Sequence, residues 1–150
     1  MEAPPQARSG AMPRIRMPSD VLDVLRGRAR QGYPHEVCGL LIGEPRPDDA
    51  GCDVVRATSA RNLRVDRARD RYELDPADQL AAEQAARREG HSVVGVWHSH
   101  PDHPARPSER DRAVAWERWS YVIVSVDAAG ACEIRSWRLR GASFVEEVLE

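Results

Sequence analysis

Two histidines at the end of an apolar segment are the residues whose types and spacing best support chemistry in this sequence. Residues 93–96 are valine apart from one glycine, which favours a buried strand, and His98 and His100 follow closely. Side chains two residues apart on a strand point to the same face. The two imidazoles, with Cα atoms about 6.6 Å apart, can therefore converge on one cation.

The segment after these histidines offers a third metal ligand. Pro101 cannot donate a ladder hydrogen bond and should end the strand, and two further prolines keep the following loop non-helical. Ser108 has the features of a helix N-cap, which places Asp111 in the first helical turn. If the loop folds back, the Asp111 carboxylate joins the histidines. Two histidines and one carboxylate leave one position open on a tetrahedral zinc ion, as in hydrolytic sites.

The segment 98–111, H-S-H-P-D-H-P-A-R-P-S-E-R-D, resembles the JAMM (MPN+) metalloprotease motif at every defined position. That family also places a glutamate at the edge of an early strand, and Glu36 in the segment 34–43 is similar to that element. The resemblance extends from about residue 18 to residue 148. It implies a single-domain MPN (JAB1/MPN, cytidine-deaminase-like) fold and hydrolytic activity.

The resemblance also implies a role for each site residue. His98, His100 and Asp111 would bind one Zn²⁺ ion, with a water molecule as the fourth ligand. Glu36 would be the general base that deprotonates this water and passes the proton to the leaving nitrogen. The Ser108 hydroxyl would donate to the developing oxyanion in addition to capping its helix. The chain is therefore expected to be a zinc metallopeptidase.

Size and family together indicate the substrate. Eukaryotic members of the family cut isopeptide bonds to ubiquitin-like proteins, whereas the small stand-alone bacterial members resemble processing enzymes for ubiquitin-fold sulfur carriers. With 150 residues this chain has little room for insertions. We expect cleavage after the C-terminal Gly-Gly of such a carrier, releasing an amino acid such as cysteine or a short extension. The alternatives are a non-catalytic MPN scaffold that binds partners and a RadC-like protein of DNA metabolism.

Composition bounds the remaining possibilities. The formal net charge of −2 gives no electrostatic footprint for nucleic acid, and no apolar run approaches membrane-spanning length. Cys38, Cys52 and Cys132 are an odd number without metal-type spacing, which favours reduced thiols in a cytoplasm. We expect a Pro- and Ala-rich tail over residues 1–13 and one domain over residues 14–150, as a monomer or homodimer.

Periodicity predicts an α/β fold in which a mixed β-sheet is flanked by helices. A helix capped by Ser19 or Asp20 is expected to end at Gly32, with an apolar stripe of Val21, Leu22, Leu25 and Ala29. Further helices are expected from Asp75 to Gly90, and after Ser108 with an apolar face of Ala113, Val114 and Trp116. Strands are expected over residues 38–43, 51–58, 93–100, 121–126, 132–138 and 143–149. Two prolines argue against a helix in the turn 44–50.

Three features allow more than one interpretation. The five arginines within the segment 61–71 favour a solvated loop, with a groove wall that receives a partner's tail as the alternative. Cys38 is expected to be a small buried residue, with a redox-sensitive inhibitory thiol as the alternative. The four tryptophans are expected in or near the core, although one could line a substrate groove.

Overall fold

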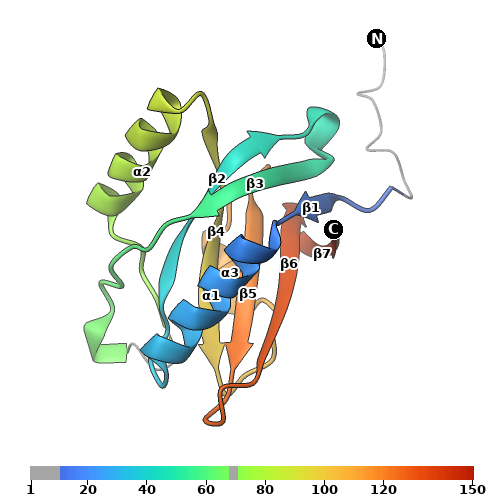
Figure 1. Ribbon diagram of the computed structural model, residues 1–150. Helices are drawn as coiled ribbons and strands as arrows, with labels where there is room; N and C mark the ends of the chain where they lie inside the picture. Colours follow the sequence, from blue (N-terminus) through green and yellow to red (C-terminus); the bar gives the residue numbers. More distant parts are fainter. Residues whose placement is uncertain (1–10, 68–70) are drawn as a thin grey trace.

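The strands of the computed structural model, which describes residues 11–67 and 71–150, form one mixed sheet that closes into a barrel (Figure 1). Neighbouring strands follow the order β1-β3-β2-β4-β5-β6-β7, and β1 also pairs with β7. The strands are β1 (Arg14–Arg16), β2 (Cys38–Pro45), β3 (Gly51–Ala57), β4 (Ser92–Pro101), β5 (Ser120–Val126), β6 (Cys132–Arg140) and β7 (Ser143–Leu149). The helices are α1 (Ser19–Gly32), α2 (Pro76–Arg88) and α3 (Glu109–Val114). The predicted α/β class, with a mixed sheet flanked by helices, is confirmed.

Strand β4 lies in the middle of the sheet, antiparallel to β2 and parallel to β5. Both faces of this region are covered, so alternate residues enter different cores. Val96 packs in the cluster that contains residues of α2, whereas Trp97 packs in the cluster that contains residues of α1. In β2, Leu40 and Leu41 are divided between the two clusters in the same way. The predicted buried apolar strand is therefore present.

Helix α1 crosses one face of the sheet (Figure 1). Of its predicted apolar stripe, Val21, Leu25 and Ala29 are buried, whereas Leu22 is partly buried. The predicted N-cap is wrong. The helix begins at Ser19, so the capping position falls on Pro18, which makes no side-chain cap hydrogen bond. The helix therefore depends on burial of its apolar stripe rather than on a polar cap.

Helix α2 covers the other face and matches its prediction more closely. The Asp75 side chain accepts a hydrogen bond of 2.9 Å from the backbone nitrogen of Ala77, as expected for an N-cap before proline. Gly90 follows the helix with φ +76°, a left-handed conformation that glycine adopts without steric cost. This helix packs against the face of the sheet that carries Val96 of β4.

Barrel closure depends on β1, a strand that we did not predict. Its three residues pair in parallel with β3, and two of them, Arg14 and Ile15, also pair in parallel with β7. The Pro13 carbonyl accepts a hydrogen bond from the Val148 nitrogen. Most of the predicted tail, residues 1–10, lies outside the described residues. The turn before β3, predicted to lack helix, contains a short 3₁₀ turn at Pro47–Asp49.

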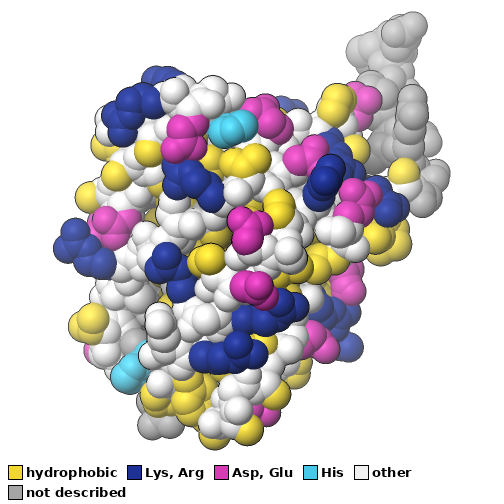
Figure 2. Space-filling model, in the orientation of Figure 1, with side chains coloured by type: hydrophobic (Ala, Val, Ile, Leu, Met, Phe, Trp, Pro, Cys, Tyr) yellow, Lys and Arg dark blue, Asp and Glu magenta, His cyan; other side chains and the backbone are white. Residues whose placement is uncertain are grey.

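Charged side chains are mixed on the face of the molecule that carries α1 and α2. Figure 2 shows acidic and basic groups interspersed over this face, as the net charge of −2 leads one to expect. Among the described residues, no helix is long and apolar enough to cross a membrane.

Candidate metal centre

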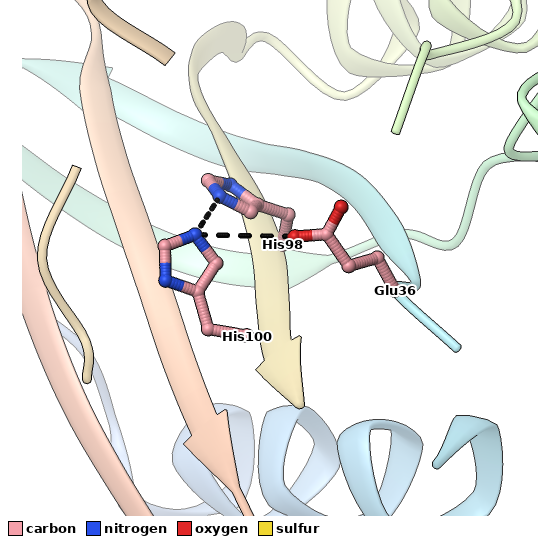
Figure 3. Close-up of side chains that lie close together, drawn as sticks. All are labelled: Glu36, His98 and His100. Atoms are coloured by element: carbon pink, nitrogen blue, oxygen red, sulfur yellow. Dashed lines mark hydrogen bonds and ion pairs between the residues drawn. The ribbon is translucent and has the colours of Figure 1, made fainter. Parts of the chain in front are cut away.

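Strand β4 holds His98 and His100 between its two neighbours. His98 lies opposite Cys38 of β2 and opposite Ile123 of β5, so the backbone is bonded from both sides. Both imidazoles are buried, and their Nε2 atoms lie 3.0 Å apart (Figure 3). The predicted projection of the two histidines from the same face of the strand is confirmed.

Asp111 reaches the histidines because the loop after β4 folds back. Its Oδ1 lies 3.5 Å from His98 Nε2, and its Oδ2 lies 3.4 Å from His100 Nε2. A capping box fixes the carboxylate: Ser108 Oγ accepts from the Asp111 backbone nitrogen at 3.0 Å. In return, Asp111 Oδ2 accepts from the Ser108 nitrogen at 2.8 Å. The residues that start α3 thus also orient the third candidate ligand.

The spacing of these three side chains is close to that of ligand atoms around one metal ion. Ligand atoms about 2.0–2.1 Å from a tetrahedral zinc ion lie about 3.3–3.4 Å from one another. Here the two Nε2 atoms lie 3.0 Å apart, and each faces a different oxygen of Asp111, at 3.5 Å for His98 and 3.4 Å for His100. Nitrogen and carboxylate oxygen are also donors that zinc prefers. Both the chemistry and the spacing of the donor set therefore suit a divalent ion.

A hydrogen bond to the loop after β4 orients the His100 ring. His100 Nδ1 lies 2.8 Å from the Pro104 carbonyl oxygen, which can only accept a hydrogen bond. The proton is therefore on Nδ1, and the Nε2 lone pair faces the other ligands. His98 Nδ1 is buried and has no hydrogen-bond partner among the described residues. Its ring is instead held by stacking on Tyr72, with ring centroids 4.3 Å apart.

The pKa values at the site differ from their ordinary range. Burial alone would raise the pKa of Asp111, but hydrogen bonding with His100 and His98 outweighs burial and the pKa is lowered. Burial lowers the pKa of His98, against the attraction of Asp111. Burial also acts to lower the pKa of His100, but Asp111 and the Pro104 carbonyl outweigh it, and the net shift is upward. An anionic carboxylate beside two imidazoles is the charge pattern of a cation site.

Glu36 lies two residues before the start of β2 and points toward the two histidines (Figure 3). Its side chain is buried, and its Oε1 lies 3.9 Å from His100 Nε2. Ligand atoms of Glu36, His98 and His100 all lie within 4.8 Å of one another. Two carboxylates therefore border the histidine pair, Asp111 in contact with both rings and Glu36 at a longer distance from His100.

A groove of about 800 Å³ opens onto these residues. We call it the metal-site groove; it includes Glu36, His100, Ser108 and Asp111 in its lining. Its other lining residues are Arg71, Tyr72, Glu73, Leu74, Gln79, Val96, His103, Pro104, Arg106, Arg110, Val114, Trp116, Trp119 and Tyr121. A segment of another polypeptide could therefore reach the site from solvent.

Two aromatic side chains near the groove differ from expectation. Helix α3 ends at Val114 because Ala115 is extended, so Trp116 does not join an apolar helix face as predicted. Trp116 is 70% exposed and stacks against Trp119, with ring centroids 6.3 Å apart. Tyr72, which stacks on His98, was not singled out from the sequence, since an isolated tyrosine after an arginine-rich loop gives no local signal.

The arginine-rich segment contributes to the groove, whereas Cys38 is buried. Arg71 lines the metal-site groove, as the groove-wall alternative required, whereas residues 68–70 lie outside the described part of the chain. Cys38 is buried and its Sγ lies near the Ala60 carbonyl oxygen at 3.8 Å. Burial, followed by the charge of Glu36, raises the pKa of this thiol to about 12. His103 is exposed and lines the groove.

Comparison with known proteins identifies the family. The model of prokaryotic homologs of the JAB domain matches residues 18–140. A desampylase of Haloferax volcanii is 34% identical over 119 residues, covering 76% of this chain and 82% of the relative. A CysO-cysteine peptidase of Mycobacterium tuberculosis is 30% identical over 141 residues, covering 93% of this chain and 92% of the relative. The chain belongs to the prokaryotic JAB (MPN) domain family.

Solved structures agree with this assignment. The solution structure of a protein from Desulfitobacterium hafniense is 32% identical and superimposes with a TM-score of 0.78, covering 91% of each chain. The predicted MPN fold is therefore confirmed, and the resemblance seen in the segment 98–111 reflects membership of the family.

Proposed function

We propose that this protein is a zinc-dependent metallopeptidase that cuts the bond after the C-terminal Gly-Gly of a ubiquitin-like sulfur-carrier protein. The convergence of His98, His100 and Asp111, with Glu36 beside them at the base of an open groove, carries the proposal. The names of the relatives, desampylase and CysO-cysteine peptidase, support the peptidase class and its ubiquitin-like substrate. The products are the freed carrier and the group that it carried, which is an amino acid such as cysteine or a short C-terminal extension.

His98, His100 and Asp111 are the metal ligands in this proposal. Asp111 is preferred over Glu36 as the third ligand because its two oxygens lie 3.4 and 3.5 Å from the two imidazoles. Zinc bound here would lower the pKa of a coordinated water to about 7 and polarise the scissile carbonyl. The buried surroundings of the histidines strengthen every electrostatic interaction at this point.

Glu36 acts as general base and then general acid. Its carboxylate borders the histidine pair, with Oε1 3.9 Å from His100 Nε2, so it can take a proton from the attacking water. The same carboxylate then gives the proton to the leaving nitrogen. Proton transfer of this kind contributes about 10²–10⁴-fold in rate.

Ser108 stabilises the negative charge that develops on the carbonyl oxygen. Its Oγ already accepts a hydrogen bond from the Asp111 nitrogen at 3.0 Å, and its hydroxyl proton remains available for donation. Ser108 also lines the metal-site groove. Removing one such donor typically costs about 10²–10³-fold in kcat.

The carrier's tail occupies the metal-site groove. Two glycines present no side chain and can lie extended in a narrow channel close to the metal ligands. Trp116 and Trp119 form an aromatic wall beside this path and offer a contact for the carrier or its attached group. The reduced cysteines are consistent with action in the cytoplasm.

Intact-mass measurement tests the proposal. The purified protein is incubated, with and without a chelator, with conjugates of the ubiquitin-fold carriers that are encoded in the same genome. We expect a mass loss at the carrier's C-terminus that the chelator blocks. Stoichiometric zinc without cleavage of any conjugate would instead support the scaffold alternative. Tight binding to DNA would support the RadC-like alternative.

A further inference from the structure

The Asn62 side chain uses its full hydrogen-bonding capacity next to the candidate general base. Its Nδ2 donates to the Glu36 carbonyl at 3.1 Å and to the Arg71 carbonyl at 3.0 Å. Its Oδ1 accepts from the backbone nitrogens of Arg64 and Glu73, both at 2.9 Å. One amide thus joins three stretches of backbone that are separate in sequence.

These contacts hold the two ends of the arginine-rich loop together. Asn62 and Leu74 form an isolated antiparallel bridge, and the Leu63 nitrogen donates to the Glu73 carbonyl at 2.8 Å. Arg71, which Asn62 binds directly, immediately precedes Tyr72 in the chain. The Tyr72 ring stacks on His98, so the loop ends in contact with a candidate metal ligand.

Glu36 needs such support because it lies outside the strand ladder. The next residue, Val37, is fixed to β4 through Ser99: the Val37 nitrogen donates to Ser99 Oγ and the Ser99 nitrogen donates to the Val37 carbonyl, both at 2.9 Å. The Glu36 carbonyl is bonded on the other side by Asn62. The peptide unit from which the Glu36 side chain projects is therefore held between β4 and the loop.

We infer that Asn62 is a positioning residue of the hydrolytic site, which aims Glu36 and seats Tyr72 against His98 through backbone hydrogen bonds. This inference rests on the proposed function of Glu36 as the base. Asn62 does not line the metal-site groove and touches neither substrate nor metal ligand. It acts through the placement of its neighbours, and a displacement of about 1 Å at a reacting group can cost on the order of 10²-fold in rate.

Two substitutions separate the contacts of Asn62. Asn62→Asp keeps an oxygen that accepts from Arg64 and Glu73 but loses both Nδ2 donors, so the bond to the Glu36 carbonyl is removed. Asn62→Ala removes all four hydrogen bonds. Asp75→Ala is the control, because it removes the α2 N-cap at the end of the same segment without touching Glu36. That control is expected to cost about 1 kcal/mol of stability.

Three quantities are measured for each purified variant: the turnover of a carrier conjugate, the zinc content and the melting temperature. We expect both Asn62 variants to lower kcat about 10- to 100-fold, to change KM less than threefold and to bind zinc stoichiometrically. Asp75→Ala should lower the melting temperature while keeping wild-type kcat. A purely structural role for Asn62 would instead predict that kcat follows the melting temperature in all three variants.

A double-mutant cycle with Glu36→Gln gives the decisive comparison. In the Glu36→Gln variant the carboxylate that Asn62 positions is absent. Asn62→Asp should therefore cause little further loss of kcat in that background. Wild-type kcat for Asn62→Asp, or losses that multiply independently with those of Glu36→Gln, would overturn the inference while leaving the proposed function standing. A wild-type protein that cleaves no conjugate would overturn the proposed function and this inference together.

Discussion

His100 Nδ1 lies 2.8 Å from the carbonyl oxygen of Pro104, only four residues further along the chain. The histidine and the loop that turns back toward the site are thus tied together. The loop orients the ring whose Nε2 atom faces His98, and it also carries Asp111 to the same point. Metal binding should therefore depend on the loop as a unit rather than on three independent side chains.

Metal removal should lower both activity and stability. Zinc at 100 times its dissociation constant stabilises the folded state by about 2.7 kcal/mol. For a chain of this length each kcal/mol shifts the melting temperature by about 2–4 °C, so a chelator should lower it by roughly 5–10 °C. Asp111→Asn keeps an oxygen that can accept from the Ser108 nitrogen but loses the anionic ligand. Differential scanning calorimetry of that variant should show little response to zinc; a full response would remove Asp111 from the ligand set.

Glu36→Gln should separate metal binding from catalysis. The amide has nearly the same shape as the carboxylate but cannot accept the water proton, so kcat should fall by about 10²–10⁴-fold. Zinc content should remain one ion per chain, because Glu36 is not a ligand in our assignment. Atomic absorption and turnover on the same preparation check both statements. Loss of zinc from this variant would show that Glu36, whose ligand atoms lie within 4.8 Å of those of both histidines, binds the metal itself.

Trp116→Ala should weaken substrate binding without changing the metal site. An exposed tryptophan at a groove is a common centre of binding energy, and its truncation typically costs about 1–2 kcal/mol or more. We expect KM for a full carrier conjugate to rise about 5- to 30-fold. Leu80→Ala is the matched control, since Leu80 is also an exposed apolar residue but does not line the metal-site groove. Equal KM values for the two variants would place the carrier elsewhere.

Two glycine substitutions should change stability in opposite directions. A Cβ at Gly39 would lie closer to the Thr58 carbonyl oxygen and to Trp97 Nε1 than van der Waals contact permits. Gly39→Ala should therefore cost about 1–3 kcal/mol or more. A Cβ at Gly27 within α1 meets no atom within 4 Å, so Gly27→Ala should stabilise the protein by about 0.5–1 kcal/mol. Urea unfolding of both variants measures the two effects, and a destabilised Gly27→Ala would contradict the second.

The three cysteines should differ in reactivity. Burial raises the pKa of Cys38 to about 12 and that of Cys52 to about 11, and both side chains are inaccessible. Only the thiolate reacts with alkylating reagents, so these two should resist iodoacetamide at pH 8 in the folded protein. Cys132 is partly exposed and should be labelled first. Peptide mapping after partial alkylation identifies the modified residue, and fast labelling of Cys38 would revive its role as a redox-sensitive thiol.

The sequence predicted those parts of the site that depend on local rules. Period-2 alternation was enough to place His98 and His100 on one face, and the capping pattern of Ser108 and Asp111 was enough to start α3. Asn62 could not be recognised in this way. Its partners Glu36 and Glu73 lie 26 and 11 residues away, and no periodicity indicates such contacts.

The unpredicted parts of the fold have similar physical causes. Strand β1 contains only three residues, too few for any alternation to be recognised, and its pairing partners are β3 and the distant β7. Trp116 was placed on a helix face because the apolar spacing continues past Val114. The helix stops there because the backbone at Ala115 becomes extended, and local propensity does not determine that point.

The position of β1 between β3 and β7 has a consequence for biosynthesis. Ile15 pairs with Leu149, so the seam of the barrel cannot close until β7 has left the ribosome. Until then the sheet has free edges that can pair with other chains. Slow synthesis or truncation near residue 148 should therefore favour aggregation of nascent protein, even though every residue of the metal centre has already emerged.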